Sequence, residues 1–198
     1  MVPKTLRQEH TEHTRRALID AATRLFAERG YADTSIDEVA GAARVTRGAL
    51  YHHFASKQEI FAAVCDAVDG AVVDRVREAA AGGGTGQERA RRVLDAYFEA
   101  SREPAYRAIV LTEAHVAVAR EDGQRYTPAM FAAIDGLVRD LAEAGEISVE
   151  DPEMLSRLLC ATLHEVASAI GAGTHPSASP ATVEYAKKII CDMLFGGR

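Results

Sequence analysis

The chain has 198 residues, 47% hydrophobic and 26% charged, with a formal net charge of −6, so it is long enough for one large domain or two small ones. The N-terminus lacks the apolar segment of a secretory signal, and the longest uncharged run, residues 166–183, is broken by Gly, Ser and Pro, which excludes a membrane span. The three cysteines, Cys65, Cys160 and Cys191, are far apart, which favours buried thiols in a reducing cytoplasm over disulfides or a zinc site. We therefore expect a cytoplasmic protein without metal or cofactor.

The predicted secondary structure is helical from end to end, without a convincing strand. Capping-box patterns begin at Ser35, Ser56 and Thr85, and a cap residue followed by proline occurs at 127–128, 151–152 and 179–180. With the apolar periodicity, these signals predict an all-α fold of about nine helices, and residues 82–84 form a flexible glycine linker. The predicted helices span residues 12–29, 35–42, 46–53, 56–80, 86–102, 104–119, 128–144, 152–171 and 180–195.

Charge divides the chain unevenly. Residues 1–58 contain nine Lys or Arg and seven Asp or Glu, whereas the other 140 residues contain 14 basic and 22 acidic side chains. A slightly basic head on an acidic body is typical of a small polyanion-binding module attached to a larger domain that does not bind polyanions.

The two short helices at 35–42 and 46–53 have the layout of a helix-turn-helix, in which the second helix enters the DNA major groove. On that second helix, Arg47 can bind guanine through two hydrogen bonds, Gly48 allows close approach to the groove, and the methyl of Ala49 can pack on thymine. Tyr51 and the histidines offer hydrogen bonds to DNA. The full candidate DNA-binding set is Thr34, Ser35, Arg44, Thr46, Arg47, Gly48, Ala49, Tyr51, His52, His53 and Lys57.

The segments TSIDEVA (residues 34–40), VTRGALYHHF (45–54) and Ser56-Lys57 resemble the DNA-binding domain of the tetracycline-repressor (TetR) family. The resemblance covers residues 12–62. It implies a homodimer that binds DNA, a C-terminal domain that dimerises and usually holds a ligand, and phosphate contacts from Tyr51 and Lys57. The corresponding domains are residues 1–55 and 56–198, with the helix at 56–80 as the connector.

Arg44 departs from the family pattern, which usually has glycine at this turn position with a positive φ. A non-glycine residue there costs about 1 kcal/mol. Either the turn is rebuilt, or Arg44 tolerates the strain and gains a phosphate contact, which is the alternative we favour.

The last two predicted helices are amphipathic, and in the resembled family they form a four-helix interface with the partner. Part of each apolar stripe also serves the core of a single subunit. The predicted interface residues are Leu155, Leu159, Thr162, Leu163, Val166, Val183, Ala186, Ile190, Met193 and Leu194.

The candidate ligand pocket is less clearly marked, because an aromatic residue or Met at helical spacing is more often core than ligand wall. The candidate lining residues are Tyr97, Phe98, Tyr106, His115, Met130, Phe131 and His164. Glu113 and Arg125 are equally consistent with surface charges.

The sequence favours a regulator, most readily a repressor, that a small molecule releases from a palindromic operator in double-stranded DNA. The alternatives are an enzyme in the helical C-terminal domain and a regulator without a small-molecule ligand. The sequence has no nucleophile–base pair, P-loop or metal motif, which argues against the enzyme.

Overall fold

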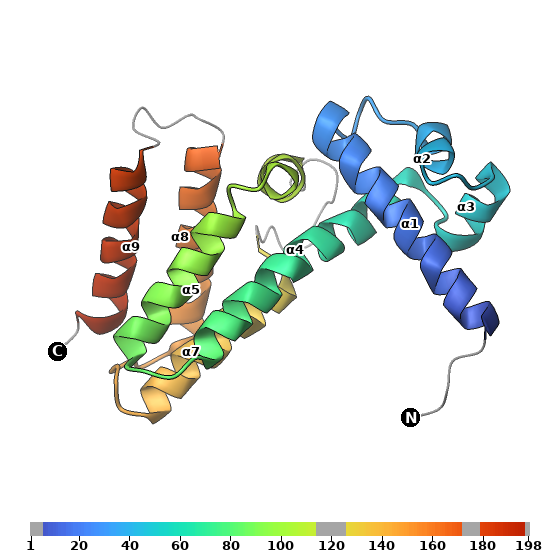
Figure 1. The fold of residues 1–198 in the computed structure, drawn as a ribbon. Helices are drawn as coiled ribbons and strands as arrows, with labels where there is room; N and C mark the ends of the chain where they lie inside the picture. The colour runs from blue at the N-terminus through green and yellow to red at the C-terminus, as the bar shows by residue number, and fades with distance from the viewer. Residues whose placement is uncertain (1–5, 114–125, 172–178, 197–198) are drawn as a thin grey trace.

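The computed structural model describes residues 6–113, 126–171 and 179–196 and confirms the all-α fold, since the described residues form helices and no strand. Figure 1 shows their arrangement. The elements are α1 (Leu6–Arg29), α2 (Ile36–Ala42), α3 (Arg47–His53), α4 (Lys57–Ala81), α5 (Gly86–Ala100), η1 (Tyr106–Glu113), α7 (Pro128–Glu143), α8 (Pro152–Gly171) and α9 (Pro180–Phe195).

The helices form two groups joined by α4. Helices α1, α2 and α3 lie at one end, and α4 runs from them into a body made of α5, η1, α7, α8 and α9 (Figure 1). In the body α5 packs on α4 and α9, and α8 packs on α7 and η1. Because α4 contacts α1 as well as α5, η1 and α7, any change in the body that moves α4 also moves the N-terminal helices.

The N-terminal group has its own core. Leu18, Phe26, Leu50 and Phe54 are each 0–1% exposed and form the centre of this core. Phe61 on the second turn of α4 completes this core, with its ring centroid 5.2 Å from that of Phe26 in an edge-on contact. The first turns of α4 are therefore part of the N-terminal group as well as the beginning of the connector.

Most of the helix caps predicted from the sequence are present in the structure. Ser35 and Thr85 each accept a hydrogen bond from the backbone N–H of the glutamate three residues later and complete a reciprocal capping box. Thr127 and Ser179 cap helices whose first residue is proline. At Ser56 the box differs, because the carboxylate of Glu59 accepts from the backbone N–H of Ala55 at 2.6 Å rather than from the cap residue.

Three boundaries differ from the prediction. Helix α1 begins at Leu6 rather than at residue 12, so His10 lies within it with an exposed side chain. The predicted helix at 104–119 is described only to Glu113, and from Tyr106 it has the wider π-helical turn. The glycine linker is held in place, because the Arg92 guanidinium donates to the carbonyl oxygens of Gly82 and Gly83, both at 2.8 Å. No described helix has the length and apolar character needed to span a membrane.

Candidate nucleic-acid interface and ligand cavity

The turn between α2 and α3 contains the backbone conformation that the sequence predicted. Arg44 has a φ of 57°, in the left-handed region that usually requires glycine. The backbone N–H groups of Arg44 and Val45 donate to the carbonyl oxygens of Gly41 and Ala40 at 3.1 and 3.0 Å, so the turn closes normally. The alternative in which Arg44 tolerates the strain is confirmed for the conformation, and its phosphate contact stays a prediction.

Helix α3 turns one face to the core and the opposite face to solvent. Thr46 caps the helix by accepting from the backbone N–H of Ala49 at 3.2 Å, and Leu50 is fully buried. Arg47 and Gly48 are exposed, and the Tyr51 side chain is 42% exposed. A Cβ at Gly48 would meet no atom within 4 Å, so the fold itself does not require glycine at this exposed position.

Two neighbours hold the Arg47 side chain in place. Its guanidinium donates to the Asp37 carboxylate at 3.0 Å, and its Cζ lies 5.6 Å from the centroid of the Tyr51 ring. Both the arginine and the aspartate side chains are more than half exposed, so the ion pair contributes little to stability. The guanidinium therefore leaves Asp37 at little cost and is then available to another acceptor.

Lys57 and the histidines border this surface. The Lys57 ammonium lies 4.4 Å from the centroid of the Tyr31 ring and donates to the carbonyl oxygen of Ala32 at 3.1 Å. Partial burial lowers the pKa of His53, and the nearby charges of His52 and Arg15 lower it further. His53 is therefore mostly neutral at physiological pH and offers one donor and one acceptor.

Thr34 and Ser35 serve the fold. The Thr34 side chain is only 1% exposed, and its hydroxyl donates to the carbonyl oxygen of Gly30 at 2.9 Å. The hydroxyl is therefore turned inward and closes the end of α1, and a contact of Thr34 with DNA stays a prediction. Ser35 is exposed, but its hydroxyl is engaged with Glu38 in the capping box.

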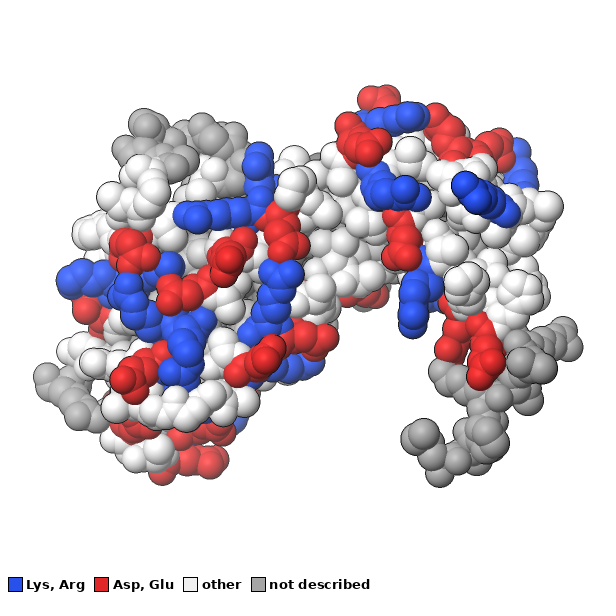
Figure 2. Space-filling model, viewed as in Figure 1, with Lys and Arg blue, Asp and Glu red and all other residues white. Residues whose placement is uncertain are grey.

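The surface charge is mixed on the face shown in Figure 2, where Lys and Arg alternate with Asp and Glu over both ends of the molecule. Exposed acidic side chains, Asp37 among them, lie close to the basic groups of the N-terminal helices. An interface here would depend on individual side chains of α3 more than on a broad basic field.

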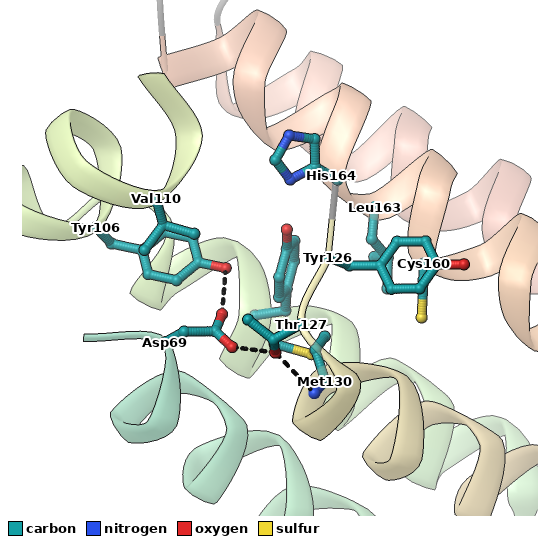
Figure 3. Close-up of a pocket in the computed structure, with 10 residues that line it drawn as sticks. Asp69, Tyr106, Val110, Tyr126, Thr127, Met130, Cys160, Leu163 and His164 are labelled. Carbon is teal, nitrogen blue, oxygen red and sulfur yellow. Dashed lines mark hydrogen bonds between the residues drawn. The ribbon is translucent and has the colours of Figure 1, made fainter. Parts of the chain in front are cut away.

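A small cavity lies in the body between α4, α5, η1, α7 and α8, and it has a volume of about 20 Å³. Such a space holds about one water molecule. Figure 3 shows the side chains around it. The described residues that line it are Asp69, Tyr97, Tyr106, Val110, Tyr126, Thr127, Met130, Cys160, Leu163 and His164.

Asp69 of α4 lines this cavity and is 3% exposed. The Tyr106 hydroxyl donates to it at 3.3 Å, and the Thr127 hydroxyl donates to its other oxygen (Figure 3). The same Thr127 oxygen accepts from the backbone N–H of Met130 at 3.1 Å and so caps α7. One carboxylate on α4 thus connects η1 and α7.

Burial controls the other polar groups of the cavity. It raises the pKa of Tyr97 and of Tyr106, and the neighbouring Asp69 carboxylate acts in the same direction. Burial also raises the pKa of the Cys160 thiol to about 12, which makes this thiol unreactive at neutral pH. His164 is 3% exposed, and its Nε2 lies 3.3 Å from the Ser168 hydroxyl.

Comparison with known proteins matches both groups of helices to one family. Residues 18–64 match the bacterial regulatory proteins of the tetR family, and residues 87–196 match the tetracyclin repressor-like C-terminal domain. The chain belongs to the TetR family. A TetR-family transcriptional regulator from Pectobacterium atrosepticum is 31% identical, with a TM-score of 0.75 and 94% of each chain covered.

Other TetR-family relatives extend the comparison. The Transposon Tn10 TetC protein of Escherichia coli is 44% identical over 63 residues, which are 32% of this chain and 32% of that protein. The chain thus matches about a third of that curated relative's length. FadR from Bacillus subtilis, solved in complex with stearoyl-CoA, is 19% identical with a TM-score of 0.74, covering 90% of this chain and 98% of FadR, and shows the shared fold. The Pectobacterium atrosepticum protein and FadR are both described as transcriptional regulators.

The predicted pocket residues divide into three groups in this TetR structure. Tyr97, Tyr106, Met130 and His164 line the cavity together. Phe98 is buried, at 3% exposed, but does not line the cavity. Phe131 stacks on Tyr126 with 6.2 Å between the ring centroids, and the Arg157 guanidinium lies over the Phe131 ring. His115 and Arg125 lie outside the described residues.

The predicted pocket did not contain the other six lining residues, which are Asp69, Val110, Tyr126, Thr127, Cys160 and Leu163. Asp69 had a usable signal, since it continues the apolar spacing of Cys65, Val72 and Val76 on α4 and therefore lies on the buried face. Thr127 was recognised as a helix cap, and capping does not exclude a second hydrogen bond.

Half of the ten residues predicted for the dimer interface are buried within one subunit. Leu159, Leu163, Val183, Ile190 and Leu194 are 2–9% exposed, and all but Val183 surround a second, apolar cavity against α5 and α7. Leu155, Thr162, Val166 and Ala186 are partly buried, and Met193 is 44% exposed. The more buried apolar stripe of each helix packs within the subunit, with α8 against α7 and α9 against α5.

A second apolar stripe on the same two helices stays exposed. Met154 and Leu158 are 54% and 51% exposed on α8, and Tyr185, Ile189 and Met193 are 66%, 40% and 44% exposed on α9. Their spacing of four residues places each group along one side of its helix. We call these five side chains the apolar stripe.

Glu113, at the end of η1, connects the body with the N-terminal helices. Its Oε2 accepts from the backbone N–H of Tyr31 at 2.5 Å, across 82 residues of sequence. Gly30, with a φ of +85°, gives it room, because a Cβ there would lie 2.6 Å from the other carboxylate oxygen. Glu113 is therefore an anchor and not the free surface charge that the sequence allowed. The described residues contain no His, Cys, Asp or Glu cluster fit for a metal.

Proposed function

We propose that this TetR-family chain is a homodimeric repressor that binds a palindromic operator through two copies of α3 and leaves it when a small molecule occupies the cavity of the body. The observation that carries the proposal is the outward face of α3. This face presents Arg47, Tyr51 and His52 around Gly48, where no part of the chain fills the space of a side chain. A protein that binds chromosomal DNA in this way belongs in the cytoplasm.

In the proposed complex Arg47 leaves Asp37 and binds a guanine, and Tyr51 and Lys57 contact phosphates on either side. Arg44 adds a phosphate contact from the turn. Arg47 already points along a fixed direction, since Tyr51 lies under its guanidinium. Less side-chain freedom is then lost on binding DNA.

The apolar stripe supports the dimer. Exposed Leu, Ile, Met and Tyr side chains gathered on two adjacent helices favour burial against a second copy. A two-fold axis through this stripe places two equivalent α3 helices on one side, and an operator with two-fold symmetry follows from that.

The route from cavity to DNA begins with Asp69 and Tyr106. Asp69 belongs to α4, which carries the N-terminal helices, and Tyr106 belongs to η1, whose Glu113 holds Tyr31. A ligand that displaces Tyr106 thus acts on both elements that reach the N-terminal group. A difference in affinity of about 1–3 kcal/mol between the two arrangements weakens operator binding roughly 5–150-fold.

The experiment is a selection of binding sites from random duplex DNA with the full chain, followed by titration of the recovered site. We expect an inverted repeat. Arg47→Ala should relax the preference at one base pair in each half-site, and Lys57→Ala should weaken all sequences alike and reduce the salt dependence. Recovery of no preferred sequence would refute the proposal, and recovery of single asymmetric sites would refute its dimeric form.

A further inference from the structure

The body contains two cavities of different chemistry. The first is the cavity lined by Tyr106 and Thr127, and the second lies between α5, α7, α8 and α9; each has a volume of about 20 Å³. The ten described residues that line the second cavity are all apolar and 1–9% exposed. A cavity lined only by apolar side chains stays dry and binds apolar molecules. The second cavity is therefore suited to a hydrocarbon group.

The two cavities lie one helical turn apart on the same helices. On α5 the lining passes from Tyr97 in the first cavity to Val93 in the second, and on α7 it passes from Met130 to Ile134. These steps of four residues make about one turn, or roughly 6 Å along each helix. The second cavity therefore continues the first along the direction of these helices.

Leu163 of α8 lies between the cavities. Among the described residues it alone lines both of them, and it is 3% exposed. Neither space accepts an organic molecule as it stands, because each holds about one water molecule. A leucine has other staggered rotamers, so a change at this one side chain can join the two spaces. The joined space has a polar end and an apolar end.

The polar end favours an uncharged group. Burial raises the pKa of Tyr97 and of Tyr106, so these surroundings disfavour a further charge. The hydroxyls of Tyr106 and Thr127 are groups that can form hydrogen bonds with a neutral hydroxyl or carbonyl.

Given the ligand-released repressor proposed above, on which this inference rests, we propose that the ligand is a straight-chain amphiphile. Its uncharged polar end lies beside the Tyr106 hydroxyl in the first cavity, and its alkyl chain passes Leu163 into the second. The polar end acts on the hydrogen bond between Tyr106 and Asp69, and the length of the chain sets the affinity.

The test measures binding of the straight-chain alcohols from butanol to decanol to the full-length protein by calorimetric titration. Each methylene group that enters the second cavity should tighten binding about fourfold until the space is filled, and further methylene groups should add nothing. Cyclooctanol has the carbon count of octanol but is too wide to pass Leu163, so it should bind more weakly. Alcohols that all fail to bind, or an affinity that does not depend on chain length, would overturn the proposal.

Two variants distinguish the second cavity from a general affinity for apolar molecules. Ala90→Leu places a larger side chain in this cavity and should remove the gain from longer chains, while butanol still binds. Val138→Ile is the milder change in case leucine at position 90 disturbs the fold, and it should shorten the longest chain that gains affinity by about one methylene group. An unchanged dependence on chain length in both folded variants would contradict the assignment.

A second pair of variants tests Leu163. Leu163→Ala removes the side chain between the cavities and should tighten octanol binding several-fold. Leu141→Ala is the matched control, because Leu141 is also buried in the body but lines neither cavity. It should lower the melting temperature without changing the affinity for octanol. Equal effects of the two variants on octanol binding would remove Leu163 from the ligand path.

A further arm adds the operator recovered by selection, with fluorescence anisotropy as the readout. Octanol should weaken operator binding by the wild-type protein and should have less effect on Ala90→Leu. If no operator is recovered, the proposed function fails, while the chain-length series still decides the ligand class by itself. If the operator is bound and alcohols of every length leave it bound, the ligand class fails and DNA binding stands.

Discussion

Arg44→Gly should make the protein more stable and bind DNA less well. The φ of 57° costs a non-glycine residue about 1–2 kcal/mol. Glycine removes that strain, but its greater freedom in the unfolded chain lowers the free energy of unfolding by about 0.5–1 kcal/mol. Arg44 is exposed and the hydrogen bonds of the turn use backbone atoms, so glycine retains them. The expected net gain in the free energy of unfolding is about 0.5–1 kcal/mol.

The same substitution removes a positive charge from the proposed phosphate contact. The slope of log affinity against log salt is negative, and each lost phosphate contact reduces its magnitude by about 0.9, so a dimer with two copies should lose about 2 in magnitude. Urea unfolding measures the stability, and anisotropy titration of the selected operator at several salt concentrations measures the slope.

Arg44→Ala is the matched control, because it removes the charge and keeps the strain. It should show the same weaker salt dependence of operator binding without the gain in stability. A loss of stability in Arg44→Gly would refute the strain argument. An unchanged salt slope in both variants would refute the phosphate contact and leave the conformation unexplained by DNA binding.

Three further substitutions test other parts of the molecule. Gly48→Ala should raise the free energy of unfolding by up to about 1 kcal/mol, because alanine favours the helix and a Cβ here meets no described atom within 4 Å. The same variant should weaken operator binding by about 1–3 kcal/mol. Binding as tight as that of the wild-type protein would show that the DNA groove does not approach this glycine. Leu158→Asp should change the protein from dimer to monomer in sedimentation at micromolar concentration, while its melting stays cooperative. Ala132→Asp, at an exposed position of α7, should leave the dimer intact. A dimeric Leu158→Asp protein would place the interface elsewhere. Glu113→Ala should lower the free energy of unfolding, measured by urea titration, by about 1.5–3 kcal/mol. The control Glu103→Ala, which removes an exposed ion pair with Arg75, should lower it by about 0–1 kcal/mol. Equal losses in the two variants would show that the hydrogen bond of Glu113 contributes no more than an exposed ion pair.

The parts of this fold that the sequence predicted are those set by neighbours in the chain. Ser35 finds its partner three residues away, and Thr127 precedes the proline that opens α7, so their capping needs no tertiary information. The left-handed φ of Arg44 was expected from the family resemblance, because the family usually has glycine at this turn position.

The parts that the sequence could not predict depend on which surfaces meet. Helix α8 carries two apolar stripes, and periodicity alone does not say that Leu163 faces α7 while Leu158 faces solvent. The spacing of Asp69 on α4 indicates that it is buried, but its hydrogen-bond partners Tyr106 and Thr127 come from η1 and the start of α7, far along the chain. Glu113 likewise has no local signal, since its partner Tyr31 is 82 residues away.

The π-helical turn of η1 explains how one short segment serves two parts of the protein. In an α-helix, residues at positions i and i+7 lie on the same stripe, so Tyr106 and Glu113 would point to the same side. The wider turn takes an additional residue per hydrogen-bonded ring and rotates them apart. Tyr106 consequently points to Asp69 in the body, while Glu113 reaches the backbone of Tyr31. A return to α-helical winding would bring Tyr106 and Glu113 to the same side of the helix, so the two contacts together depend on the π-helical turn.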